Sequence, residues 1–274
     1  MDGNNVKALA APRVRQFGAV NWLGLWTLYL REVRRFLKVW LQTIAAPAVT
    51  TLLFLAIFLL ALGGQQRTVA GAPFLEFLAP GLIMMAMVQN AFANTTSSLM
   101  IAKVQGNIVD MLMPPLSPFE LTCGLALGGV TRGLVVGVVV AAAIALVEPL
   151  HVVSPGLAIF HAVAASLLLS VLGIIGAIWA DKFDHIASVT NFVITPLSFL
   201  SGTFYSITDA RLPAAWKAVM LANPFFYMID GFRAAFIGHA DGSITLGVAI
   251  MVVLDAALLG VCHLMFASGY KLKA

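Results

Sequence analysis

Charged side chains are scarce in this chain of 274 residues. Asp, Glu, Lys and Arg together make up 10% of it, whereas 61% of its residues are hydrophobic. A soluble domain carries about 25% charged residues, so this sequence has too little polar side chain to cover a globular surface. The composition therefore excludes a soluble enzyme, a nucleic-acid-binding protein and a disordered protein as descriptions of the whole chain.

Sequence motifs that carry chemistry are also missing. Cys123 and Cys262 lie far apart in apolar stretches, without a CxxC pair or a Cys/His cluster. No lysine follows a glycine, so the chain has no P-loop to bind ATP phosphates. HExxH and GxSxG are absent as well. We therefore expect no enzyme, no catalytic residue, no metal site, no cofactor and no nucleic-acid partner.

Long apolar runs are what the sequence has in abundance. Each run is long enough to cross about 30 Å of hydrocarbon, and none alternates with the period of a barrel strand. The fold class that we expect is all-α: a polytopic membrane protein with six transmembrane helices. The six runs cover approximately residues 40–62, 77–102, 119–147, 156–180, 186–207 and 244–267.

The distribution of Lys and Arg predicts the orientation. With a cytoplasmic N-terminus, eleven of the 16 basic residues lie on the cytoplasmic side, and only Arg67, Arg211, Lys217 and Arg233 lie opposite. This positive-inside bias predicts that both termini are cytoplasmic. Arg132, the remaining one, lies inside the third run, and we expect it to reach back to the cytoplasmic headgroups.

Residues 22–40 predict an amphipathic helix that lies in the membrane interface. Trp22 and Trp26 begin an aromatic face with helical spacing, and Arg31, Arg34 and Arg35 fall on the rest of the surface. Tryptophans opposite arginines are typical of an interfacial helix. The alternative is a simple cytoplasmic extension of the first span.

A second short amphipathic helix is predicted after the second span. Apolar Ile108 and Met111 alternate there with polar residues until Pro114 and Pro115 end any helix. The segment is either a docking site for a soluble partner or an ordinary loop. Its candidate contact residues are Lys103, Gln105, Gly106, Asn107, Asp110 and Met111.

Residues 208–243 are apolar but too charged to span the membrane. Asp230 and Arg233 lie in this stretch, and the dipeptide Asn223-Pro224 breaks it in the middle. We expect a re-entrant hairpin of two short helices that enter the outer leaflet and return. It serves either an exit pathway or packing.

An acid and two histidines lie inside predicted spans. A carboxylate at the depth of Asp255 costs about 2.5–3.5 kcal/mol on insertion scales, and His263 follows it by two turns while His161 lies in the fourth span. They form either a proton relay or, for Asp255, a hydrogen bond with the polar part of the second span. A relay would make the chain a proton-coupled secondary transporter that uses Asp255, which is the alternative function.

Glycines recur every four residues in the third span. Gly129, Gly133 and Gly137 form one row, and Gly124 with Gly128 forms another. Small residues at this spacing allow helix backbones to approach closely. The rows predict a helix-contact face, either within the subunit or across a dimer.

Four segments resemble the permease subunit of bacterial ABC-2 type (type V) ABC exporters. They are FLAPGLIMMAMVQNAFANTTSSL, KVQGNIVDMLMPPLSPFEL, GGVTRGLVVG and LANPFFYMIDGFRAAFIG. The order of the predicted helices is also similar to that family. The resemblance covers residues 19–274 as one transmembrane domain, and residues 1–18 are expected to be a disordered basic N-terminal extension.

The resemblance implies roles for these segments. Residues 22–38 would be the connecting helix, residues 103–113 the coupling helix, and residues 208–238 the re-entrant helices. The implied partners are a separate cytoplasmic ATP-binding cassette ATPase subunit, a second copy in a homodimer, and the lipid bilayer of the bacterial inner membrane. The implied function is export of a lipophilic, drug-like or lipid- or glycan-linked substrate.

Overall fold

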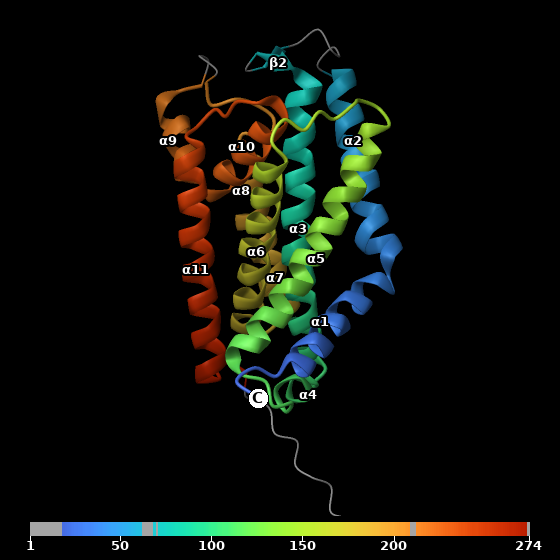
Figure 1. Cartoon of the computed structure of the whole chain (residues 1–274), viewed down its shortest axis with the longest axis vertical. Coiled ribbons are helices and arrows are strands. Elements are labelled where there is room, and N and C mark those ends of the chain that lie inside the picture. The colour runs from blue at the N-terminus through green and yellow to red at the C-terminus, as the bar shows by residue number, and fades with distance from the viewer. Residues whose placement is uncertain (1–17, 62–67, 70, 209–211, 273–274) are drawn as a thin grey trace, which may run out of the picture.

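A computed structural model describes residues 18–61, 68–69, 71–208 and 212–272 of this chain (Figure 1). Nearly all of the expected extension at residues 1–18 lies outside the described residues, as do Arg67 and Arg211.

The described chain is almost entirely helical, as expected. Thr68 and Val69 of β1 pair antiparallel with Pro73 and Ala72 of β2 in the one small sheet of the described residues. The α-helices are α1 (Trp22–Leu37), α2 (Ala46–Ala61), α3 (Phe74–Val104), α4 (Ile108–Leu112), α5 (Pro118–Ala145), α6 (Pro155–Trp179), α7 (Phe183–Val189), α8 (Thr195–Phe199), α9 (Ala214–Ala222), α10 (Pro224–Ile237) and α11 (Ile244–Ser268). Two π-helical turns, η1 (Leu41–Ala45) and η3 (Thr190–Ile194), and two strands, β1 (Thr68–Val69) and β2 (Ala72–Pro73), complete the elements.

Five helical segments of the described residues are long and apolar enough to cross a membrane. They are Leu41–Leu60, Phe74–Val104, Pro118–Ala145, Pro155–Trp179 and Ile244–Ser268. The chain is therefore an all-α polytopic membrane protein. The bundle has a sheet end, with β1 and β2, and an α4 end, where α1 crosses beside α4 (Figure 1).

The expected span over residues 186–207 is not among these five segments. Here α7, η3 and α8 form one unbroken helical stretch from Phe183 to Phe199, about 25 Å long at 1.5 Å per residue. The stretch ends because the chain turns through Gly202, at φ +77°. The hydroxyls of Ser201 and Thr203 turn back and donate to the Ser198 carbonyl.

The centre of the bundle is α3, which packs against α5 and α6 (Figure 1). In its most apolar stretch 83% of the residues are buried, compared with 22% for the segment that contains α2 and 17% for α11. Two outer helices therefore present most of their apolar surface to lipid or to another protein.

The glycine rows of α5 are contact faces within the subunit. A Cβ added at Gly124 would lie 2.7 Å from Leu28 Cδ2, and one at Gly128 would lie 2.5 Å from Glu32 Cβ. Both distances are too short for a real contact, so this row lets α1 approach α5 closely. The other row, Gly129, Gly133 and Gly137, faces side chains and backbone of α3 and α6 in the same way.

The chain bends where α1 meets α2. The π-helical turn η1 lies at the bend, just before Pro47, and a π-turn leaves carbonyls without their usual partners. The Thr43 hydroxyl donates to the Phe36 carbonyl at 2.8 Å and to the Val39 carbonyl at 3.1 Å. The Thr43 hydroxyl thus adds a bond to two carbonyls at the bend that also accept backbone N–H groups.

Candidate functional site

A buried ion pair fastens α1 to α3. The carboxylate of Glu32 accepts hydrogen bonds from Arg35 Nη2 at 3.2 Å and from Ser98 Oγ at 2.8 Å. Arg35 also donates to Asn94 Oδ1 at 2.9 Å and to Ser97 Oγ at 3.0 Å. Since Glu32 is fully buried, this network holds the middle of α1 against the polar half of α3.

A second set of bonds fastens the start of α1 to the start of α5. Ser117 and Glu120 form a capping box at the N-terminus of α5. The same Glu120 carboxylate accepts a hydrogen bond from the backbone N–H of Asn21, the N-cap of α1. Asn21 Nδ2 donates to the Pro115 carbonyl at 3.1 Å. The start of α1, the proline loop and the start of α5 are therefore one connected unit.

The exposed face of α1 carries the predicted interfacial residues. Trp22 and Trp26 are more than half exposed. Arg31 and Arg34 are exposed farther along the helix, whereas Arg35 turns inward to its network. The outward face of α1 is therefore aromatic and basic, whereas its inward face packs on α5 and α3.

Helix α4 is a short knob on the α4 end of the bundle. Ile108 and Met111 are buried against the bundle, while Val109 and Met113 are exposed, Met113 by 76%. Of the remaining candidate residues, Gln105, Gly106, Asn107 and Asp110 are exposed on the knob or on the turn before it. Gly106 has φ +73°, a left-handed conformation that suits glycine at this turn.

Lys103, the remaining candidate on this segment, lies in the last turn of α3. Its ammonium donates to the carbonyls of Ala177 at 3.2 Å, Ile178 at 2.8 Å and Ala180 at 2.5 Å. These carbonyls belong to the C-terminal end of α6, which has no further helical N–H to pair with. Lys103 therefore caps the C-terminal end of α6 and joins it to α3.

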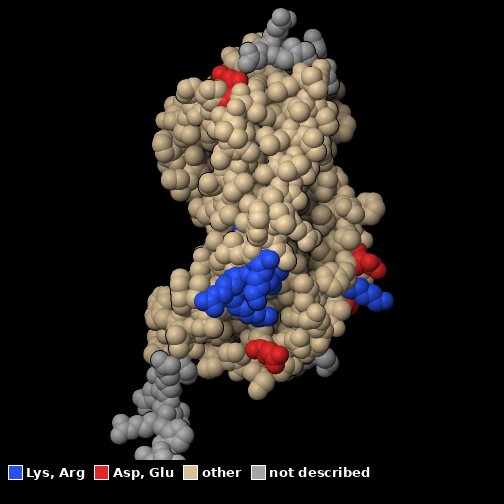
Figure 2. Space-filling model, turned by 90° about the vertical axis from the view of Figure 1, so that its right-hand side faces the viewer, with Lys and Arg blue, Asp and Glu red and all other residues tan. Residues whose placement is uncertain are grey.

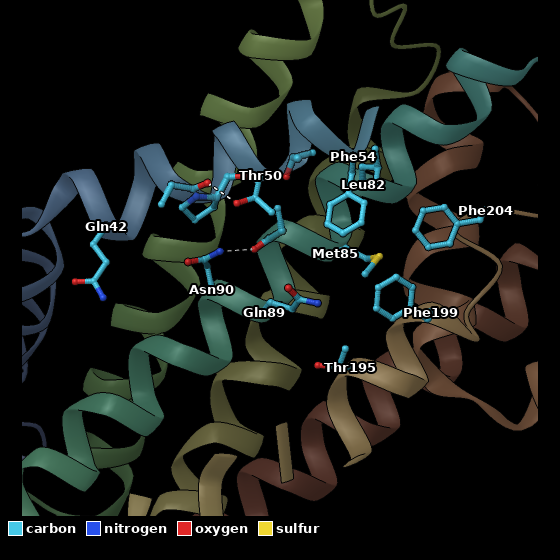
Figure 3. A pocket seen from close by; sticks show the side chains of 14 residues that line it. Gln42, Thr50, Phe54, Leu82, Met85, Gln89, Asn90, Thr195, Phe199 and Phe204 are labelled. Carbon is cyan, nitrogen blue, oxygen red and sulfur yellow. Dashed lines mark hydrogen bonds between the residues drawn. The ribbon is translucent and has the colours of Figure 1, made fainter. Parts of the chain in front are cut away.

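A polar groove runs along one side of α3, between α2 and α8. Figure 3 shows one part of it, a cavity of about 460 Å³ lined by Gln42, Thr50, Gln89 and Thr195 together with Phe54, Phe199 and Phe204 among others. In it Gln89 and Asn90 come from α3 and Thr195 comes from α8. The Phe204 ring stacks on Phe199 at 5.6 Å and on Phe58 of α2 at 4.7 Å. The groove thus combines hydrogen-bonding groups with aromatic surface.

Two further cavities extend this groove. One of about 440 Å³ shares Gln89, Asn90 and Thr195 with the first and lies between α3 and the α7–η3 stretch. Another of about 900 Å³ shares Gln42 with the first and is lined by basic residues of α1. Figure 2 shows these Lys and Arg side chains gathered in one patch toward the α4 end. The polar groups therefore extend from the basic patch to the aromatic side chains.

The hairpin exists as α9 and α10, separated at Asn223 and Pro224 as expected. Asn223 caps α10 and its Nδ2 donates to the Leu197 carbonyl at 2.7 Å. Asp230 accepts from the backbone N–H groups of residues 241 and 242, both at 2.8 Å. Arg233 lies over the Phe77 ring and donates to three backbone carbonyls. These side chains hold α10 inside the bundle at the sheet end.

The three intramembrane polar residues are not joined by direct bonds in the described part of the chain. The structure shows no hydrogen bond or ion pair between Asp255 and either His161 or His263 among the described residues, and Asp255 Oδ1 is buried without a partner. His161 Nδ1 lies 3.0 Å from the Leu157 carbonyl, and the ring packs against Gly231 of α10. Asp255 also has no hydrogen bond to the polar part of α3 within the described chain.

Arg132 does not reach the headgroups in the way that we expected. It lies about halfway along α5, points to α3, and its Nη2 donates to Asn90 Oδ1 at 2.8 Å.

Sequence reasoning also missed Glu32, which is the buried partner of Arg35. Its spacing of three residues from Arg35 was the available signal.

Comparison with known proteins decides the family. A family model described as ABC-2 type transporter matches residues 24–237 of this chain. The inner membrane transport permease YadH of Escherichia coli strain K12 is 35% identical over 253 residues, which are 92% of this chain and 98% of that protein. The chain belongs to the ABC-2 type transporter family. Nodulation protein J of Rhizobium leguminosarum bv. trifolii is 25% identical over 272 residues, 94% of this chain and 98% of that relative.

Membership of the ABC-2 family confirms the resemblance read from the four segments. The chain is a transport permease and not an enzyme. It is the membrane component of an ABC transporter, and the family implies an ATP-binding cassette partner. Its apolar helices and its ABC-2 relative support a multi-pass protein of the inner membrane.

Proposed function

We propose that this chain is the permease subunit of an ATP-driven exporter, with α4 as the coupling helix that receives a separate ATPase subunit. Both termini and α4 face the cytoplasm, in line with the excess of Lys and Arg on that side. The stretch α7–η3–α8 enters the membrane as the fifth of six spans, and the α9–α10 hairpin is re-entrant from the outer side.

The observation that carries this proposal is the shape of the α4 knob. Buried Ile108 and Met111 fix the helix to the bundle, while Val109, Asp110 and Met113 project outward. A cleft of about 530 Å³ between α1 and α4 is lined by Asp110 and Arg31 among others. Exposed apolar side chains beside a cleft with both charges suit a protein partner better than lipid.

Movement of α4 would be passed on through the contacts already described. The proline loop after α4 is bound to Asn21 of α1, and Glu120 joins the same residue to α5. Glu32 and Arg35 then join α1 to α3. A push on α4 therefore acts on the helices that border the polar groove.

We propose that a second copy closes this groove in a homodimer. The groove is polar on α3 but open between α2 and α8, and polar groups in a bilayer are costly when they face lipid. The segment that contains α2 buries only 22% of its most apolar stretch. A partner copy on this side would enclose a pathway for a lipophilic, drug-like or lipid- or glycan-linked substrate.

Copurification with charge-reversal variants tests the coupling role. We expect Asp110→Lys, combined with Met113→Asp, to lose the ATPase that copurifies with the wild-type chain from its native membrane. The matched control is Asp184→Lys, an exposed acid on α7 that receives the same substitution as Asp110. Wild-type amounts of ATPase with the double variant would contradict the proposal.

A further inference from the structure

The basic cavity between α1, η1 and α3 has a charge that the described residues do not balance. Five cationic residues line its volume of about 900 Å³, namely Arg31, Arg34, Arg35, Lys38 and Arg132, and no Asp or Glu of the described chain lines it. Arg35 is neutralised by Glu32 at 3.2 Å. The other four cations have no ion-pair partner among the described residues.

Arg132 is the residue that separates this cavity from an ordinary basic surface. Its side chain is only 8% exposed and lies in the middle of a membrane-spanning helix. Among the described residues, its side chain forms one hydrogen bond, to Asn90, and its Nε is buried without a partner. A buried guanidinium without an anion is costly, which indicates that an anion is to be supplied from outside.

The remaining lining of the cavity is apolar. Phe36, Val39, Ala93 and Ile101 contribute to it, and Val39 and Ile101 are also exposed on the outer surface. An anion held by the arginines would thus have hydrocarbon surface next to it. Gln42 continues from this cavity into the polar groove.

We propose that this cavity binds the phosphate headgroup of a membrane lipid that enters the groove as substrate. Guanidinium groups bind phosphate oxygens bidentately, and four unbalanced cations match a phosphate monoester dianion better than a single carboxylate. The apolar lining accommodates the start of the lipid chain. The inference rests on the proposed export function, because it names the substrate class of that pathway.

Thermal melting of the purified full-length chain in detergent micelles tests the site. The probe is dioleoylphosphatidic acid, with dioleoylphosphatidylcholine and inorganic phosphate as comparisons. The variant is Arg132→Gln, and the control is Lys182→Gln, an exposed lysine at the same end that does not line the cavity. A native mass-spectrometric titration of the same samples gives the affinity.

Phosphatidic acid should raise the melting temperature of the wild type and of Lys182→Gln but not that of Arg132→Gln. The variant should bind this lipid about tenfold or more weakly, since it loses a charge-assisted bond. Without lipid, Arg132→Gln should melt at or above the wild-type temperature, because it removes an unbalanced buried charge.

Four results would overturn the proposal. They are an equal shift in Arg132→Gln, an equal shift with phosphatidylcholine, an equal shift with inorganic phosphate alone, and a melting temperature of lipid-free Arg132→Gln well below the wild type. The assay needs neither nucleotide nor ATPase. Its failure would leave the coupling role of α4 standing, and loss of the coupling role would leave this assay unaffected.

Discussion

Replacing Glu32 by alanine should loosen α1 from the bundle. The carboxylate is almost fully buried, its side chain being 1% exposed, and it accepts bonds from Arg35 and Ser98. Breaking a buried ion pair costs about 3–5 kcal/mol because the remaining charge is left alone. The Arg35 side chain is 27% exposed, so solvent screening lowers this figure to about 2–3 kcal/mol.

Glu32→Gln should have a smaller effect than Glu32→Ala. The amide oxygen keeps an acceptor for Ser98 but not the negative charge opposite Arg35. Since 1 kcal/mol corresponds to about 2–4 °C in a chain of this size, the loss of about 2–3 kcal/mol in Glu32→Ala should lower the melting temperature by roughly 4–12 °C. For Glu32→Gln we expect about half of that decrease in melting temperature.

Thermal melting and hydrogen exchange measure these changes. Exchange should accelerate in α1 and stay unchanged in α11, which has no bond to this network. Asp184→Ala, which removes an exposed acid at the same end, is the control and should change stability by no more than about 0.5 kcal/mol. The reasoning fails if Glu32→Ala melts like the control, or if exchange in α11 rises as much as in α1.

Three other substitutions test the packing and the polar residues. Gly128→Val places a Cβ 2.5 Å from that of Glu32 and should cost about 1–3 kcal/mol by overpacking, whereas Gly260→Ala, with open space around it, should melt like the wild type. Arg233→Met removes the bonds to three carbonyls and should destabilise the protein by about 2–4 kcal/mol in a melting assay; a change under about 0.5 kcal/mol would refute its bridging role. Asp255→Asn should leave the ATPase activity of the reconstituted complex unchanged, because no direct bond joins Asp255 to a histidine among the described residues. Loss of that activity would contradict this prediction, and ATPase-independent transport that Asp255→Asn abolishes would favour the proton-coupled alternative.

The helices were predictable because their signals are local. Hydropathy located the long spans, and paired prolines located the end of α4. The break at Asn223 and Pro224 correctly separated α9 from α10. Each of these depends on the backbone chemistry of neighbouring residues.

The contacts between helices were not predictable to the same degree. The spacing of Gly124 and Gly128 predicts a close approach, but only the position of α1 shows that the contact lies within the subunit. Glu32 was missed because a charged residue in a basic helix is expected to be exposed unless its partner on α3 is known. The groove was visible in the sequence only as a polar second half of one span.

The shortened stretch that ends at Phe199 depends on the turn that follows it. Hydropathy continues through residues 200–207, so a window cannot find the end of the helix. The hydroxyls of Ser201 and Thr203 and the left-handed Gly202 end it instead. Such polar caps are hidden in an apolar run.

The most direct test of the coupling role is photocrosslinking from the α4 knob. A photoreactive residue replaces Val109 on α4, which is 53% exposed, or Val253 on α11, which is 65% exposed and serves as the control. The account predicts a crosslink from position 109 to an ATP-binding cassette ATPase in native membranes, and none from position 253. A crosslink of equal yield from both positions, or an ATPase that copurifies without any crosslink from position 109, would contradict it.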